Sequence, residues 1–290
     1  MEEVDATLQQ RGVKIHARSI HAVGEIAQKF GITEDIPIQI RENAPQVFTP
    51  EFIATHIHDW YEKRYGQRLK IHMGPGSIAI LIKGTPWEVK LPLIYGSVRF
   101  VCDPNLSPYR KFPKFGSNGE IPVYNVLLAI QDLPDSLANE LTEEEQHYIF
   151  EQIRTSLNAL QSLSNYSTDP FIEEAHVDLE SAVNNLVGPY PHYGLSKWAS
   201  LQFAEKIMKS KLTKRGISYP TTHILSRLAG IARTNGTFNL SEEDLSKIQC
   251  SAGVRYGEEI VSLISAMEAH HTSIKVLSEI IDDNSINYRP

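Results

Sequence analysis

The spacing of the apolar residues changes part-way along the chain. Between residues 69 and 103, short runs rich in Ile and Val are separated by the turn-forming stretches GPG, GTP and GS. Runs of this kind predict a small antiparallel sheet. From Thr142 onward the apolar residues recur every three or four positions, which predicts that the second half is almost entirely helical.

The residues before the sheet carry two helical patterns. The first covers residues 16–31 and ends at Gly31. The second begins with Thr49 as N-cap and Pro50 as the first helical residue, and it ends at Gly66. Helices followed by short strands predict an α+β N-terminal domain over residues 1–135, and no motif in it indicates its type.

The second half predicts a helical bundle. Thr142 and Glu145 have the spacing of a capping box, which opens a helix in a connecting segment, residues 136–169. The bundle itself is expected over residues 170–290. Its last helix is expected to run from Tyr256 to Ile281. Its first helix carries a single apolar stripe, made of Ile172, Ala175, Leu179, Ala182, Val183 and Leu186.

Composition and charge narrow the classes of function. The chain has 290 residues and a formal net charge of −7 at pH 7, so its overall charge does not attract nucleic acid. Its two cysteines, Cys102 and Cys250, lack metal-type spacing, and we expect no metal and no cofactor. The sequence contains no run of about 18 apolar residues, which predicts a cytoplasmic protein that does not bind a membrane.

A set of residues in the helical half follows a recognisable order: Gln202, Ala204, Glu205, Lys206, Lys209, Gly216, Thr222, His223, Leu225, Arg255 and Tyr256. In this order and spacing they resemble the HEPN domain, a small helical bundle of prokaryotic proteins linked to nucleotides and RNA. The resemblance covers Pro170 to Asp282, and the first half of the chain resembles no family. It implies a bundle that pairs as a homodimer.

Many HEPN proteins are metal-independent ribonucleases, with an Arg followed four to six residues later by a His. Here seven residues separate Arg215 from His223, which is too many for this motif. Arg11 and His16 have the required spacing, but they lie outside the HEPN-like region. The resemblance therefore implies the branch of the family without catalytic residues. Such a protein would bind a nucleotide, RNA or a protein partner, in prokaryotic defence or a toxin–antitoxin type of stress response. The alternative is a ribonuclease whose Arg and His come from separate segments.

Six residues are candidates for holding a nucleotide or RNA: Lys206, Lys209, Lys214, Arg215, His223 and Arg255. The cations of the second bundle helix either hold a phosphate or solvate the end of the helix and stabilise its dipole. We expect Lys206, Lys209 and Arg215 at an exposed helix end, with Trp198, Ala204 and Met208 buried. A protein partner is expected to bind through the N-terminal domain.

Other histidine pairs predict no metal site. His56 and His58 lie two positions apart in a predicted helix, and His270 and His271 are adjacent in another. Helical residues with these spacings point to different faces, so neither pair converges on one ion.

Overall fold

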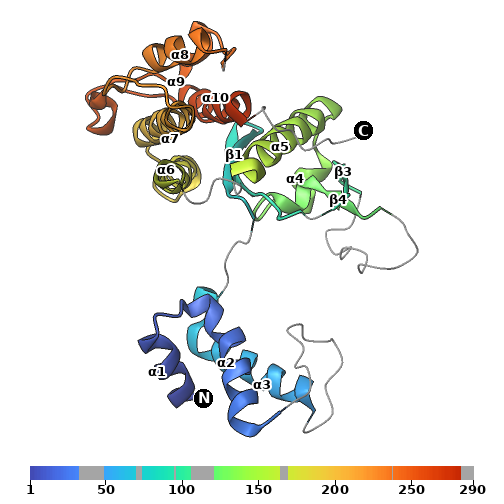
Figure 1. Cartoon of the computed structure of the whole chain (residues 1–290). Helices are drawn as coiled ribbons and strands as arrows, with labels where there is room; N and C mark the ends of the chain where they lie inside the picture. Colours follow the sequence, from blue (N-terminus) through green and yellow to red (C-terminus); the bar gives the residue numbers. More distant parts are fainter. Residues whose placement is uncertain are drawn as a thin grey trace. The chain divides into compact units, whose positions relative to one another are not determined.

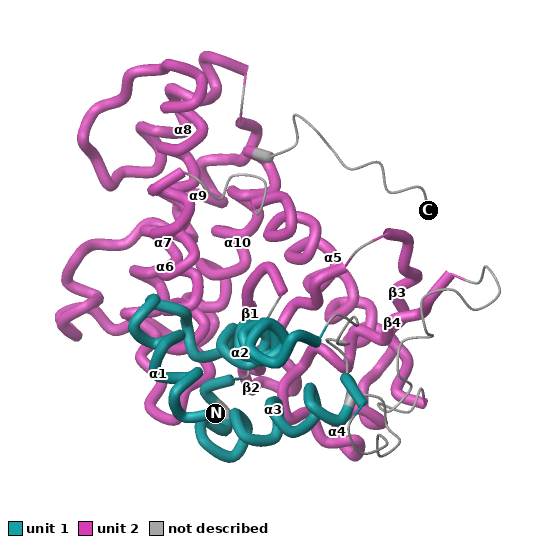
Figure 2. Tube along the Cα trace, turned by 60° about the horizontal axis from the view of Figure 1, so that its bottom comes forward, with its two compact units in different colours: residues 1–72 teal, residues 73–290 magenta. Residues whose placement is uncertain are grey.

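The computed structural model of the protein describes residues 1–32, 49–69, 74–94, 96–105, 121–163, 169–236 and 238–281. The chain divides into two compact units, Met1–His72 and Met73–Pro290, which Figure 2 distinguishes by colour.

The described part of the first unit is helical. Its elements are α1 (Glu2–Gln10), α2 (Ile15–Phe30), α3 (Pro50–Tyr65) and a 3₁₀ turn (Gly66–Leu69). Leu8, Ala22, Ile57 and Tyr61 form its buried core. The predicted ends of α2 and α3 are confirmed. Gly31 takes the left-handed conformation after α2, and the Thr49 side chain accepts the Phe52 N–H at 3.2 Å.

The second unit contains the strands. β1 (Ser77–Ile82) and β2 (Thr85–Lys90) form an antiparallel hairpin, which confirms the predicted small antiparallel sheet. The segment 99–101, expected in the same sheet, is instead β3 (Arg99–Val101), paired in parallel with β4 (Val123–Asn125). Pro92 follows the hairpin and has no N–H to continue a ladder. Residues 70–73, expected as a first strand, lie outside the described residues.

The rest of this unit is mostly helical (Figure 1). Its helices are α4 (Asp135–Asn139), α5 (Glu143–Leu163), α6 (Pro170–Val187), α7 (Tyr193–Lys214), α8 (Leu225–Thr234), α9 (Glu242–Ile248) and α10 (Leu263–Ile281), with 3₁₀ turns η2 (Val126–Ala129) and η4 (Ala252–Arg255). The capping box forms, because the Thr142 N–H donates to Glu145 at 2.9 Å and the Glu145 N–H donates to Thr142 at 3.2 Å. Every residue of the predicted stripe on α6 is buried.

The last helix is shorter than predicted. α10 begins at Leu263, whereas the apolar pattern placed its start at Tyr256. The chain leaves η4 through Gly257, whose φ of 75° is left-handed and cannot continue a right-handed helix. Arg255 and Tyr256 therefore lie in a turn rather than on the last helix.

The hairpin and the helical bundle share one hydrophobic core. α7 packs between α6 and α10, and β1 packs against α5, α6 and α10. The continuous core extends from Ile78 on β1 to Ile280 on α10. The unit boundary at 72/73 thus differs from the expected domain limits at 135 and 169. A two-stranded hairpin is too small to be stable alone, and here it buries its apolar face on the bundle.

Candidate functional site

One face of α7 carries a polar row that ends at a tryptophan. Trp198, Gln202, Glu205 and Lys209 are spaced four, three and four residues apart, so they share one side of the helix. Glu205 is buried. Its carboxylate accepts hydrogen bonds from Lys209 Nζ at 2.6 Å and from Gln202 Nε2 at 3.4 Å. The charge is therefore compensated inside the bundle.

His223 reaches this row from the segment between α7 and α8. Its Nδ1 lies 2.8 Å from Glu205 Oε2. The His223 side chain is 63% exposed, whereas that of Glu205 is 5% exposed. Gln249 holds the backbone on either side of the ring, donating to the His223 carbonyl at 3.3 Å and accepting the Leu225 N–H at 3.0 Å. A buried carboxylate thus orients an imidazole that faces solvent.

Arg255 reaches the same tryptophan from η4. Its guanidinium carbon lies 5.2 Å from the centre of the Trp198 ring and 5.5 Å from that of Tyr256, which is within cation–π range. The His223 ring centre is 6.4 Å from that of Trp198. We call this group the Trp198 site, and it consists of Trp198, Glu205, His223, Arg255 and Tyr256.

Gly194 allows η4 to approach α7 closely enough for this contact. A Cβ at this position would lie 2.2 Å from the Val254 carbonyl oxygen, the residue before Arg255. The absence of a side chain at Gly194 therefore places Arg255 against Trp198.

The comparisons with known families identify this part of the chain. Residues 168–283 match the family model of the HEPN domain. This region is a HEPN domain. The N-terminal region matches no family. The chain matches no curated protein and no solved structure.

Lys206 of the HEPN domain binds a neighbouring helix. Its Nζ lies 2.7 Å from Asp178 and 3.1 Å from Glu174, both on α6, and its side chain is 20% exposed. Burial raises the pKa of Asp178, and the pair with Lys206 opposes this shift only in part.

The expected exposure of Lys206 and Lys209 is wrong. Lys206 lies against α6, and Lys209 pairs with Glu205 with a side chain only 13% exposed. Each of these lysines has a carboxylate partner that is itself largely buried, Asp178 for Lys206 and Glu205 for Lys209, and a charge can be buried when it is paired in this way. Ala204 and Met208 are buried as expected, whereas Trp198 is only partly buried.

Lys214 and Arg215 lie at the C-terminal end of α7 in the HEPN domain. Lys214 Nζ is 3.8 Å from Asp169, the N-cap of α6, and burial lowers the pKa of Lys214. Arg215 is the C-cap of α7. A helix rises 1.5 Å per residue, so Lys214 lies about 24 Å along the axis from Trp198. Of the six candidates, His223 and Arg255 lie beside Trp198, and Lys209 is joined to His223 through Glu205, whereas Lys206, Lys214 and Arg215 are placed elsewhere.

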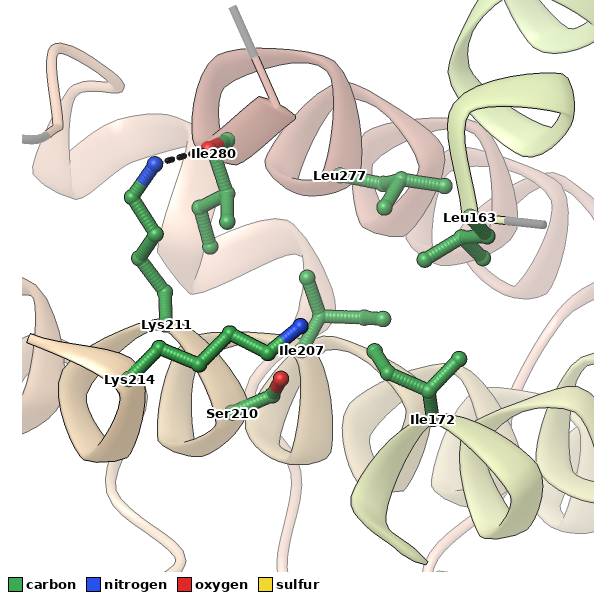
Figure 3. A pocket seen from close by; sticks show the side chains of 8 residues that line it. All are labelled: Leu163, Ile172, Ile207, Ser210, Lys211, Lys214, Leu277 and Ile280. Carbon is green, nitrogen blue, oxygen red and sulfur yellow. Dashed lines mark hydrogen bonds between the residues drawn. The ribbon is translucent and has the colours of Figure 1, made fainter. Parts of the chain in front are cut away.

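A pocket lies at this C-terminal end of α7 (Figure 3). It is lined by Leu163, Ile172, Ile207, Ser210, Lys211, Lys214, Leu277 and Ile280. Lys211 Nζ donates to the Ile280 carbonyl at 2.6 Å across its rim. The cavity volume is about 20 Å³, which is room for about one water molecule. The pocket is therefore too small for a nucleotide.

Trp198 and Glu205 belong to the site although the sequence pattern did not predict them as binding residues. A signal was present, because Glu205 interrupts the apolar residues of α7 and lies four positions before Lys209. A carboxylate in the middle of a buried helix requires partners, which points to a polar cluster at that position. The sequence does not indicate that His223 and Arg255 supply the rest of that cluster.

The described residues include neither a metal-binding cluster nor a membrane-spanning helix. They contain no group of three or more His, Cys, Asp or Glu side chains able to hold a metal ion. None of their helices has both the length and the apolar character needed to cross a membrane.

Proposed function

We propose that the HEPN domain binds a nucleotide or single-stranded RNA at the Trp198 site. The observation that carries the proposal is the convergence of the His223 imidazole and the Arg255 guanidinium on one tryptophan. Arginine binds phosphate through a planar fork of N–H groups, and aromatic rings stack on nucleobases. The site therefore combines N–H groups that can bind a phosphate with an aromatic surface on which a base can stack.

The local charge supports this ligand in a chain of net charge −7. Glu205 is the acidic member of the site, and it is buried and paired with Lys209 and His223. Within the Trp198 site, the groups left for a ligand are consequently Arg255, His223 and the aromatic rings, and the exposed carboxylates of Glu258 and Glu259 follow in the next turn. Phosphate contacts of this kind weaken as salt screens them, so affinity is expected to fall with rising ionic strength.

A binding assay tests the proposal. We expect fluorescence anisotropy with labelled single-stranded RNA to show a loss of about tenfold or more for Trp198→Ala and for Arg255→Ala, since stacking contributes about 1–3 kcal/mol per base. Arg154→Ala is the matched control, because Arg154 is an exposed arginine on α5 that pairs with Glu151. Unchanged RNA affinity in both site variants would contradict the proposal.

A second candidate function is metal-independent cleavage of RNA. It is favoured by the pairing of the exposed His223 with the buried Glu205, an arrangement suited to a general base. His223 would take the proton of a ribose 2′-hydroxyl, whose oxygen bonds to the adjacent phosphorus as the bond to the 5′-oxygen breaks. The proton would then pass from His223 through solvent to the departing 5′-oxygen, which leaves a 2′,3′-cyclic phosphate and a 5′-hydroxyl. Arg255 would stabilise the charge on the phosphorus centre.

Incubation of the purified protein with RNA and a metal chelator distinguishes the two functions. Cleavage that is lost in His223→Ala supports the ribonuclease. RNA binding without cleavage supports the binding protein.

We also propose that the HEPN domain forms a homodimer. Tyr190, Ile260 and Ile264 are exposed apolar residues. They flank the N-terminal ends of α7 and α10, which Lys197 and Ser265 join by a hydrogen bond of 2.9 Å. Light scattering is expected to give twice the chain mass of 32.7 kDa. Ile260→Glu should shift the protein to a monomer, whereas a monomeric wild-type protein at micromolar concentration would refute the proposal.

The N-terminal unit is proposed to bind a protein partner. Ile20 and Phe30 on α2 are exposed apolar side chains that such a partner could cover. Mass spectrometry of the protein purified from its host should then show a co-purifying chain that is lost in Phe30→Glu. A role in prokaryotic defence or a toxin–antitoxin type of stress response follows from the HEPN domain by family analogy.

A further inference from the structure

We propose that Glu205 is a positioning residue, which fixes His223 with its Nε2 outward as a hydrogen-bond acceptor and so selects ligands that carry a ribose hydroxyl. The ligand part of this inference rests on the proposed function, whereas the positioning part concerns the protein alone.

The hydrogen bonds of Glu205 determine which nitrogen of His223 carries the proton. An ionised carboxylate only accepts hydrogen bonds, so the Nδ1 atom 2.8 Å from Glu205 Oε2 must be a donor. In a neutral imidazole the other nitrogen, Nε2, then bears a lone pair and accepts. Glu205 thereby sets the tautomer of His223.

Burial determines where the accepting nitrogen points. Glu205 contacts the ring at Nδ1 and has 5% of its side chain exposed, whereas 63% of the His223 side chain is exposed. The edge of the ring opposite Glu205 therefore faces solvent. The residue before His223 is also fixed. Thr222 is buried, and its Oγ1 accepts the Ile224 N–H at 3.1 Å across His223.

A purely structural role for His223 does not account for this arrangement. Glu205 already receives hydrogen bonds from Lys209 and Gln202. A third donor whose role was only to compensate the buried carboxylate of Glu205 would not need to leave most of its own side chain exposed to solvent.

An outward acceptor selects for a hydroxyl on the ligand. A ribose 2′-hydroxyl donates to Nε2, and a deoxyribose has no group at that position. One such hydrogen bond corresponds to a preference for RNA over DNA of the same sequence of about fivefold to tenfold. The site is therefore specific for ribonucleotides through His223, under the control of Glu205.

The tautomer is measured directly by ¹⁵N NMR of the histidine side chains in the full chain. We expect the neutral form of His223, assigned by its loss in His223→Asn, to carry its proton on Nδ1. We expect Glu205→Leu to abolish this preference while the melting temperature confirms that the variant is folded. A wild-type His223 protonated on Nε2 would overturn the positioning role.

The affinity for RNA and for DNA of one sequence tests the ligand part. His223→Asn keeps an amide that donates to Glu205 and removes the outward acceptor, so its RNA preference should disappear without a change in melting temperature. His147→Asn is the matched control, because His147 is exposed on α5. Binding of both oligonucleotides with equal affinity by the wild-type protein would overturn the selectivity alone. If the wild-type protein binds neither oligonucleotide, both the proposed function and the selectivity are overturned. The NMR result still decides the role of Glu205 in that case.

Discussion

His270 and His271 form hydrogen bonds with the backbone N–H and the backbone carbonyl of one residue, Ala79. The Ala79 N–H donates to His270 Nε2 at 3.0 Å, and His271 Nε2 donates to the Ala79 carbonyl at 2.9 Å. These groups lie on the edge of β1 away from β2, where a further strand would otherwise pair. The two side chains thus replace a neighbouring strand and attach the hairpin to α10.

The buried His270 predicts a stability that decreases in acid. Burial lowers the pKa of His270 from 6.5 to about 3. In the unfolded chain His270 takes up a proton near pH 6.5, whereas in the folded protein it is protonated only near pH 3. The free energy of unfolding should therefore be fully retained above pH 6.5 and fall by up to about 1.4 kcal/mol per pH unit below it.

Denaturant titrations between pH 7 and pH 4 check this expectation. His270→Gln keeps an acceptor for the Ala79 N–H and removes the titrating ring, so the dependence on pH should be weaker. His147→Gln replaces an exposed histidine and should leave the dependence as it is. An equal slope in all three proteins would show that His270 does not control acid stability.

Gly194 is predicted to be essential for the approach of η4 to α7. In Gly194→Ala the new Cβ would lie 2.2 Å from the Val254 carbonyl, so η4 must move away. We expect a loss of about 1–3 kcal/mol in unfolding free energy, together with weaker RNA binding through Arg255. Gly230→Ala on α8 meets nothing within 4 Å and should be neutral or stabilising by about 0.5–1 kcal/mol. Equal stability of the two variants would contradict the close contact.

At the scale of elements, α7 is joined to α6 by charge as well as by apolar packing. Lys206 bridges Glu174 and Asp178 in a largely buried position. Lys206→Met would leave Asp178 without its cation, and the loss of one partner of a buried pair costs more than the pair itself contributes.

We therefore expect Lys206→Met to lower the free energy of unfolding by about 1–3 kcal/mol at pH 7. Lys247→Met on α9 is the control, because Lys247 pairs with Glu243 and Asp244 at a more exposed position. Its change should stay within about 0.5 kcal/mol. Equal losses of unfolding free energy in Lys206→Met and Lys247→Met would mean that the contact of Lys206 with α6 stabilises the fold no more than an exposed ion pair does.

At the scale of the whole molecule, the two units have separate cores. Leu8 is buried in the core of the first unit and Leu157 in that of the second. The larger core of the second unit extends from the hairpin to α10. Small domains bury a smaller fraction of their surface and are less stable.

Calorimetry of the full chain should consequently show two transitions, with the first unit unfolding at the lower temperature. Leu8→Ala is expected to lower only the first transition, and Leu157→Ala only the second, each by the effect of about 2–5 kcal/mol typical of a leucine cavity. A single transition that moves as a whole with either substitution would disprove the independence of the units.

The sequence by itself determined the local features of this protein. The N-cap at Thr49, the end of α2 at Gly31, the capping box at Thr142 and the buried stripe of α6 depend on residues within a turn or two of one another. The order and spacing of residues in the helical half likewise predicted the HEPN domain, and the family match over residues 168–283 confirms it.

Tertiary structure decided the features that join distant segments. The pairing of β3 with β4, the bonds from His270 and His271 to Ala79, and the meeting of His223 and Arg255 at Trp198 each connect residues that no local pattern relates. The burial of Lys206 and Lys209 was also decided there, because a lysine is exposed or enclosed according to the carboxylates that packing brings to it. Helix formation is governed by neighbours three and four residues away, whereas a binding site depends on contacts that form only when the whole core has closed.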